Sequence, residues 1–459
     1  MDVVSVIQDF TGKTIVADTG YTELWYQYYQ GNVTGFHNYL EYNGIKDIDC
    51  TRKTLNMPKK ICEDWANLLL NEKTDVVVGN DEQQQQLDNL LNSVNFWVKG
   101  NEGIEKSFAL GKGALVQSVD EAGNPHLQFV NGLKIYPITI EHGKITECAF
   151  VNSGSRETII QIHTKGENGN YDINTLIYEK QQNTMADDIG SLVQHLTLNT
   201  GSNLPWYQII KPNIANNIDI NSPLGISIYA NALDNLQGVD LAYDGFCEEM
   251  RLGRARIFVN KDLVRYDENG ETPTFDNNEV GFYYGGSTDN DKVKPFEFYS
   301  PTLRVENYFN GINNALNLLS AKVGFGENHY RFDQGGISTA TQIISENSEM
   351  FRTLKKHEIL LNDVIIEACK VLMYIHNTFK EDVFKFDLSA NIEVKFDDSI
   401  IEDKETMKIT DRQDVSMGVM SKIEYRMKWF NEDEETARQK IAGIDEEQKA
   451  NSLNFFSEE

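Results

Sequence analysis

Residues 324–336 read GFGENHYRFDQGG, and the run that follows them, residues 338–379, contains neither glycine nor proline. Interior glycine costs a helix about 1 kcal/mol and proline about 3 kcal/mol, so the 42-residue run predicts one long helix. At about 1.5 Å per residue it would reach about 63 Å, longer than a compact core needs. Residues 302–323 predict an amphipathic helix before the glycines. A mobile loop between two helices suits a protein that grips something passing by.

One face of the expected long helix repeats at alternating spacings of three and four residues. Its members are Ile344, Asn347, Phe351, Leu354, Glu358, Leu361, Ile365, Ala368, Leu372 and Ile375. Such a heptad stripe predicts that this face packs on another helix. Because the polar members lie in the first half of the stripe, we expect burial there to be incomplete.

The composition points to a large and strongly acidic protein. With 459 residues, of which 40% are hydrophobic, the chain can bury a sizeable core. Seventy acidic residues against 42 basic ones give a net charge of −28. This average field repels duplex DNA and argues against a regulator held on DNA by counterion release. It remains compatible with a conduit in which DNA must slide without sticking.

Five cysteines, an odd number without a Cys-x-x-Cys pair, predict reduced and mostly packed thiols. The first twenty residues mix charged side chains into every apolar stretch, which argues against a signal peptide. No stretch approaches the roughly 20 apolar residues that a bilayer span needs. We therefore expect a soluble, intracellular protein.

The pattern along the chain predicts an α+β fold. Helices are expected at residues 58–71, around 87–94 and at 224–252, the last started by Asn221-Ser222-Pro223. Between residues 113 and 178, short apolar runs alternate with turn residues, which predicts an antiparallel sheet of hairpins. Residues 190–205 are expected to be a loop that leads out of this sheet.

The second half of the chain is expected to be mostly helical. A strand at 255–259 leads into a turn-rich segment, 260–301, with extended character at 280–284 and 294–299. All nine prolines lie at or before Pro301. Further on, the pattern predicts one strand and three helices, at residues 392–396, 403–417, 421–430 and 433–448.

The sequence contains only incomplete matches to phosphate-binding and metal-binding motifs. Thr11-Gly12-Lys13-Thr14 resembles the end of a phosphate-binding loop, but Ile7 stands where that motif needs glycine, so a surface turn is the better interpretation. Gly111-Lys112-Gly113 precedes a strand, which favours a turn into the sheet. Acidic turns at 267–270 and 289–291 lack the ligand pattern of a calcium loop. We expect no catalytic residues, no metal and no cofactor.

The glycine-rich loop carries groups that can meet phosphate or sugar edges: His329, Tyr330, Arg331, Phe332 and Gln334. From spacing alone, the segment is either a nucleic-acid contact or a simple connector.

Six stretches together resemble one protein family. They are LNMPKKICEDWA at 55–66, ALGKGA at 109–114, SPLGISIY at 222–229, RLGRARIFV at 251–259, GISTATQ at 336–342 and FDDSIIED at 396–403. In this order and spacing the chain is similar to portal proteins of tailed bacteriophages, in particular the group found in long-tailed phages of Gram-positive bacteria. None of the stretches is a catalytic motif.

The resemblance implies a portal-type architecture. It implies an α/β wing at residues 1–222, a helical stem with a small α/β clip at 223–323 and a tunnel loop at 324–336. A tunnel helix and its continuation would occupy 337–390, and a wing strand with a helical crown would occupy 391–459.

The resemblance also implies a function. Twelve subunits would form a ring at one capsid vertex, through which double-stranded DNA is packaged and ejected. The implied partners are the terminase large subunit, the major capsid and scaffolding proteins and a head–tail adaptor, with no membrane. Such a protein is assembled in the host cytoplasm and stays in the virion.

On this basis we expect specific loop residues to contact DNA or to act as hinges. The expected DNA contacts are Lys322, Asn328, His329, Arg331 and Gln334. The expected hinges are Gly324, Gly326, Gly335 and Gly336. Two alternatives stay open: another head-assembly or minor capsid protein without a channel, and a nucleotide-dependent enzyme that uses residues 11–14.

Overall fold

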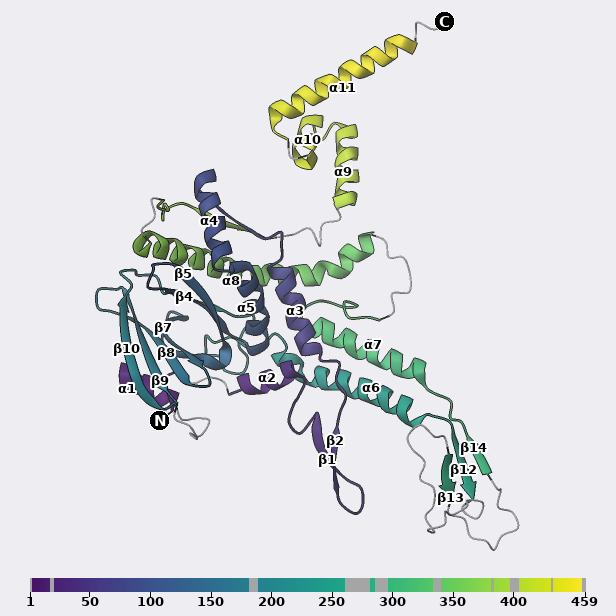
Figure 1. Cartoon of the computed structure of the whole chain (residues 1–459). Coiled ribbons are helices and arrows are strands. Elements are labelled where there is room, and N and C mark those ends of the chain that lie inside the picture. The colour runs from purple at the N-terminus through teal and green to yellow at the C-terminus, as the bar shows by residue number, and fades with distance from the viewer. Residues whose placement is uncertain are drawn as a thin grey trace, which may run out of the picture. The chain divides into compact units, whose positions relative to one another are not determined.

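The computed structural model describes nine ranges of the chain: residues 2–16, 20–180, 189–260, 281–284, 296–332, 340–380, 384–396, 404–430 and 432–455. The fold is a mixed α+β fold, as the sequence predicts (Figure 1). The chain divides into two compact units. The larger contains residues 1–334 and 352–396, and the smaller contains residues 335–351 and 397–459.

The larger unit begins with helices and one isolated hairpin. In chain order these elements are α1 (Val3–Thr11), α2 (Thr22–Gln30), β1 (Asn38–Tyr42), β2 (Asp47–Thr51), α3 (Met57–Leu69), β3 (Asp75–Val78), α4 (Asp81–Ser93) and α5 (Phe96–Leu110). Pro58 lies in the first turn of α3, where a missing N–H costs nothing. The side chain of Asn80 caps α4 by accepting the Gln83 N–H.

Two antiparallel sheets follow, where the sequence predicts one. The strands are β4 (Gly113–Val119), β5 (Pro125–Asn131), β6 (Ile135–Glu141), β7 (Lys144–Ser153), β8 (Glu157–Lys165), β9 (Tyr171–Glu179), β10 (Ser191–Asn199) and β11 (Tyr207–Ile210). One sheet has the order β10-β9-β8-β7-β6, and the other has the order β11-β4-β5. The chain enters β4 through Gly111 in the left-handed conformation, which confirms the expected turn.

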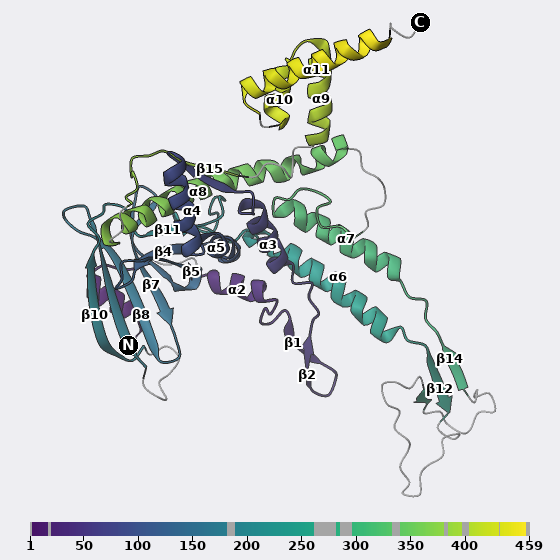
Figure 2. The same ribbon diagram turned by 45° about the horizontal axis from the view of Figure 1, so that its top comes forward.

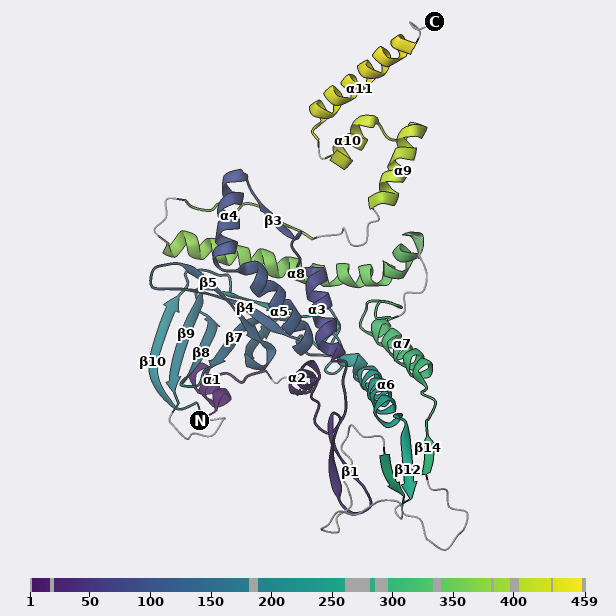
Figure 3. The ribbon, with the colours of Figure 1, turned by 45° about the vertical axis from the view of Figure 1, so that its right-hand side comes forward.

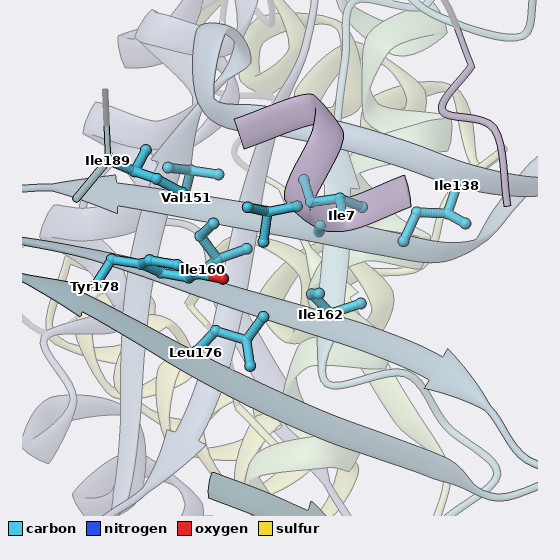
Figure 4. Packing of buried hydrophobic residues seen from close by; sticks show 10 residues of the cluster. Ile7, Ile138, Val151, Ile160, Ile162, Leu176, Tyr178 and Ile189 are labelled. Atoms are coloured by element: carbon cyan, nitrogen blue, oxygen red, sulfur yellow. The ribbon is translucent and has the colours of Figure 1, made fainter. Parts of the chain in front are cut away.

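Strand β7 contributes side chains to two hydrophobic clusters, one on each of its faces. Ala149 and Val151 belong to a cluster with Ile7 of α1 (Figure 4). The alternating residues Cys148 and Phe150 pack instead with residues of β4 and β11. Because successive side chains of a strand point to opposite faces, β7 is buried on both sides.

The prediction of a loop at residues 190–205 is wrong, because most of this segment forms strand β10, which pairs with β9. Eight of the nine β10 positions are exposed, Leu198 being the exception. The strand therefore lacks the alternation of buried and exposed residues that sequence patterns detect.

The helix expected from residue 224 begins nine residues later, as α6 (Leu233–Leu252), after a 3₁₀ turn. Residues 224–229 are buried against the end of α5 instead. The Ile228 N–H donates to the Phe108 carbonyl at 2.9 Å. A Cβ on Gly225 would lie 2.1 Å from the carbonyl oxygen of Gly111. These tertiary contacts take the place of the expected helical turns.

Helices α6 and α7 (Val305–Lys322) form an antiparallel pair that ends in a small sheet (Figure 2). That sheet contains β12 (Arg256–Asn260), β13 (Gly281–Tyr284) and β14 (Phe296–Tyr299), with β12 in the middle. The predicted amphipathic helix before the glycines is therefore confirmed.

The long helix is confirmed as α8, Ala340–Phe379. Leu354, Leu361, Ile365, Ala368, Leu372 and Ile375 of the predicted stripe are all buried. Glu358, where we expected incomplete burial, is buried as well, with its carboxylate 3.0 Å from Lys355 Nζ. After α8, strand β15 (Ile392–Lys395) pairs antiparallel with β3.

In the smaller unit, α9 (Lys404–Met417), α10 (Lys422–Phe430) and α11 (Glu434–Phe455) match the three predicted helices. Trp429 Nε1 of α10 donates to the carboxylate of Asp411 of α9 at 2.7 Å. Ser421 and Glu424 form a reciprocal capping box at the start of α10.

Candidate functional site

The candidate site is the segment that follows α7. Gly324 and Gly326 have φ values of 89° and 81°, in the left-handed region that favours glycine. A Cβ on Gly324 would also lie 2.7 Å from the Cγ2 atom of Thr353 on α8. Both the backbone conformation and the close approach of α8 therefore require glycine at position 324.

An aromatic stack holds this segment against the core. The Phe325 ring is 1% exposed and lies between two other rings. Its centroid is 4.4 Å from that of Trp65 on α3 and 4.3 Å from that of His329, and both pairs are stacked. Trp65 Nε1 donates to the Val323 carbonyl at 3.2 Å. His357 of α8 also contacts Trp65, in an edge-to-face arrangement with a centroid distance of 5.2 Å.

Tyr330 makes a second anchor. Its hydroxyl donates to Asp64 Oδ2 of α3 at 2.9 Å. Burial, followed by the neighbouring Asp64 carboxylate, raises the pKa of Tyr330, so the phenol stays protonated and remains a donor. Lys60, one turn before Asp64, pairs with that carboxylate through Oδ1. The segment is therefore bound to α3 by stacking and by a charge-assisted hydrogen bond.

Three polar side chains of α7 bind the same segment along its length. Ser320 Oγ donates to the Gly326 carbonyl at 2.7 Å, and Asn317 Oδ1 accepts the Asn328 N–H at 2.6 Å. Asn313 Oδ1 accepts the Phe332 N–H at 3.2 Å. At spacings of four and three, positions 313, 317 and 320 lie on one helix face. Residues 324–332 thus fold back along α7 as an ordered turn.

The expected contact residues occupy different environments. Lys322, Asn328, His329 and Arg331 are all exposed, and neither Lys322 nor Arg331 has an ion pair with another described residue. Partial burial lowers the pKa of His329, so its stacked ring is neutral at pH 7. Gln334, together with the expected hinges Gly335 and Gly336, lies outside the described residues.

Sequence reasoning missed the anchoring residues. Asp64 and Trp65 stand about 260 positions before the loop, and no local pattern links them to it. The Asn313, Asn317 and Ser320 side chains share a face of an amphipathic helix, which is the one signal that could have indicated a bound segment. Phe325, between two glycines, gave no sign that it is buried.

Outside the loop, the described residues show no phosphate-binding arrangement at residues 11–14 and no metal-binding cluster. Gly12 ends α1 in the left-handed conformation, and Lys13 pairs with Glu147, so residues 11–14 form a turn rather than a phosphate cradle. Within the described ranges, no three His, Cys, Asp or Glu side chains are placed to hold a metal ion. Among the same residues, no helix has the length and hydropathy of a membrane span. All five cysteines are free thiols.

Two hollows lie away from the loop. One, of about 1170 Å³, is an open groove lined by residues of α3, α4 and α5. The other, of about 550 Å³, is lined by both sheets and α8 and includes Lys112, Lys211 and Glu367. Burial lowers the pKa of Lys211 and raises that of Glu367. Neither lining contains a residue of the 324–332 turn.

One of the comparisons with known proteins shows the family. The model of the family described as phage portal protein, SPP1 Gp6-like, matches residues 17–452. No curated protein matches the chain. A solved structure described as "Neck of native GTA particle computed with C12 symmetry" shares 9% sequence identity, with 92% of this chain and 97% of that chain covered, at a TM-score of 0.42. The resemblance found in the sequence is thus confirmed: the chain belongs to the SPP1 Gp6-like family of phage portal proteins.

Proposed function

We propose that this portal protein assembles into a ring of twelve identical subunits around an axial channel at one capsid vertex. Double-stranded DNA passes through this channel during packaging and again during ejection. The family match over nearly the whole chain supports the portal role. The protein has no enzymatic activity of its own, and the phage is a long-tailed phage of a Gram-positive host.

The elements divide into the regions of a portal subunit. Residues 1–222 form the wing, to which β15 returns by pairing with β3. Within 223–323, α6 and α7 form the stem and β12–β14 form the clip. Residues 337–390 contain the tunnel helix and its continuation, and the helices of 391–459 form the crown. The α6–α7 pair, capped by one small sheet, is the feature that supports the stem and clip assignment.

The turn at 324–332 is the observation that carries the proposed DNA contact. Stacking on Trp65 and hydrogen bonds to α7 fix its backbone. The cations of Lys322 and Arg331 remain exposed at its two ends. In a ring whose subunits each carry −28, isolated cations make weak transient contacts while the acidic surroundings prevent sticking.

In this proposal the remaining loop residues have different roles. Asn328 and Gln334 offer polar contacts to phosphate, whereas His329 contributes through its stack on Phe325. Gly324 and Gly326 shape a fixed turn and do not act as hinges. The expected hinges at Gly335 and Gly336 stay part of this proposal.

The ring binds the terminase large subunit, the major capsid and scaffolding proteins and a head–tail adaptor, and it assembles in the host cytoplasm. The two alternatives make different predictions. A head-assembly protein without a channel would give no ring with a central hole in electron micrographs. A nucleotide-dependent enzyme would hydrolyse ATP as the isolated chain, whereas we expect no turnover.

The DNA contact is tested by neutralising the two exposed cations. We expect Lys322→Gln with Arg331→Gln to reduce the number of DNA-filled particles while ring mass stays unchanged. Replacing the whole loop is a poorer test, since it would also remove the buried Phe325 ring. The matched control neutralises two exposed cations of the five-stranded sheet, Arg156→Gln with Lys165→Gln. Equal DNA content in both variants would contradict the proposal.

A further inference from the structure

The β1–β2 hairpin is an exposed apolar element with no partner inside the described chain. Its sheet contains these two strands only. Leu40 and Tyr42 are each 66% exposed, and Ile45 at the turn is 87% exposed. A two-stranded hairpin is marginally stable by itself in water, and exposed apolar groups of this size mark interaction sites. Something outside the single subunit is therefore expected to cover it.

The base of the hairpin is bound firmly to α6. Asp240, 5% exposed, accepts three hydrogen bonds from the segments that flank the hairpin. The donors are His37 Nε2 at 3.0 Å, Thr54 Oγ1 at 2.9 Å and the Leu55 N–H at 2.9 Å. One turn along α6, Asp244 accepts the Lys53 N–H. The hairpin is thus held at its base, and it projects on the same side of the larger unit as the small sheet at the end of α6 and α7 (Figures 1 and 3).

A complementary surface lies where α6 ends and α7 begins. We call it the base patch, and it consists of Arg251, Leu252, Leu303, Arg304 and Val305, all exposed. The two segments touch: a Cβ on Gly253 would lie 2.1 Å from Leu303 Cδ2, and Arg304 pairs with Glu249 at 2.7 Å. Arg251 pairs with Glu248 at 2.7 Å, so both guanidinium groups already have a carboxylate partner on α6. Three apolar side chains and two exposed, ion-paired guanidinium groups therefore share one small surface.

One face of the hairpin carries apolar and acidic side chains, which are complementary to the apolar and basic side chains of the base patch. In its antiparallel register Leu40 lies opposite Asp49, and Tyr42 lies opposite Asp47. Residues directly opposite each other share a face of the sheet, so this face carries two apolar side chains and two carboxylates. The face and the base patch are both exposed in the single subunit, so they do not cover each other within one chain.

We propose that the β1–β2 hairpin of one subunit packs on the base patch of the next subunit in the ring. Leu40 and Tyr42 cover Leu252, Leu303 and Val305, while the two aspartates pair with the two arginines. The contact joins two different surfaces of identical chains, so repeating it closes a ring when the rotation fits. This inference rests on the ring in the proposed function and names the contact that builds it.

A charge-swap experiment tests the interface on the full chain. The variants are Asp47→Lys with Asp49→Lys on the hairpin, Arg251→Glu with Arg304→Glu on the base patch, and all four changes combined. Each is compared with the wild type by sedimentation and light scattering for particle mass, and by circular dichroism for folding. The matched control reverses two exposed acidic residues of the wing, Glu141→Lys at the end of β6 with Glu167→Lys in the turn before β9.

We expect both two-site variants to stay folded and to sediment mainly as 52.3 kDa subunits. The four-site variant and the control should recover most of the wild-type ring. If both two-site variants formed rings at the wild-type level, the proposed interface would be wrong. The hairpin would then be expected to bind a different protein. A folded four-site variant that stays monomeric would also overturn the interface. A wild-type chain that never assembles would instead overturn the ring of the proposed function, and this interface with it.

Discussion

At the scale of single residues, Phe325 links the loop to the core. Its ring is almost fully buried between Trp65 and His329, so truncation would leave a cavity at the point where the turn joins α3. We expect Phe325→Ala to lower the free energy of unfolding by about 3–5 kcal/mol. Denaturant unfolding followed by fluorescence measures this loss.

Phe332 provides the matched control for that change. It lies in the same turn but is 61% exposed, so Phe332→Ala should change the free energy of unfolding by about 0.5 kcal/mol or less. Equal losses for the two variants would show that the stack does not anchor the turn.

The Tyr330 hydroxyl is a second single-residue test. Tyr330→Phe keeps the buried ring and removes only the donor to Asp64. Since hydrogen bonds to charged groups contribute about 1.5–3 kcal/mol, we expect a loss of about that size. Asp64→Asn in the Tyr330→Phe background should then cost little more. A large additional loss would mean that Asp64 acts mainly through other partners, such as Lys60.

His163 makes the larger unit sensitive to acid. Its ring is fully buried beside Phe150 and Tyr207, and neither ring nitrogen has a hydrogen-bond partner among the described residues. Burial lowers its pKa to about 3, below the unfolded value of about 6.5. The stability that depends on the neutral ring is therefore complete above pH 6.5 and is lost as the pH falls towards 3.

Replacing this ring with an uncharged one should remove that sensitivity. Between pH 7 and pH 5, we expect the wild type to lose about 2 kcal/mol more stability than His163→Phe. Thermal unfolding of both proteins at the two pH values measures the difference. Parallel pH profiles would contradict the assignment.

Individual contacts of the site could be anticipated from the sequence only in part. Lys322 and Arg331 are exposed cations, as expected of contact residues in a polar loop. The Trp65 contact could not be found, because it joins residues about 260 positions apart and no periodicity connects them. His329 is exposed, as expected of a contact residue, but its stacking on Phe325 leaves no sequence pattern.

At the scale of elements, the long helix was the most predictable feature. An unbroken run of helix-forming residues with a heptad stripe is a strong local signal, and the buried positions of α8 follow it. The start of α6 and the strand β10 could not be predicted. In the first case tertiary contacts of Gly225 and Ile228 override a good capping signal, and in the second an exposed edge strand carries no alternation.

The α8 stripe leads to a matched pair of substitutions. Ile375 is fully buried and Ile359 is 64% exposed on the same helix. Ile375→Ala should cost about 2–5 kcal/mol, whereas Ile359→Ala should cost less than about 1 kcal/mol. Chemical denaturation of the two variants compares them directly, and similar costs would show that the stripe does not set the packing of α8.

At the scale of the whole molecule, this phage portal protein is a component of the phage particle at the capsid vertex. Its acidic composition argued against a DNA-binding regulator from sequence alone, and six short stretches indicated the family. Composition could not show which cations are exposed without an ion pair. In the structure, Lys322 and Arg331 are two such cations among the described residues, at the ends of a turn whose backbone is fixed by α3 and α7.

The central claim is that this turn faces the DNA in the channel. It is tested most directly by replacing Arg331 with the photoreactive residue p-benzoylphenylalanine and irradiating particles that are stalled during packaging. The control carries the same residue in place of Glu121, an exposed position in the β4–β5 turn. We predict DNA cross-links from position 331 and none from position 121. Equal labelling of both positions, or none at 331 in particles that contain DNA, would contradict the account.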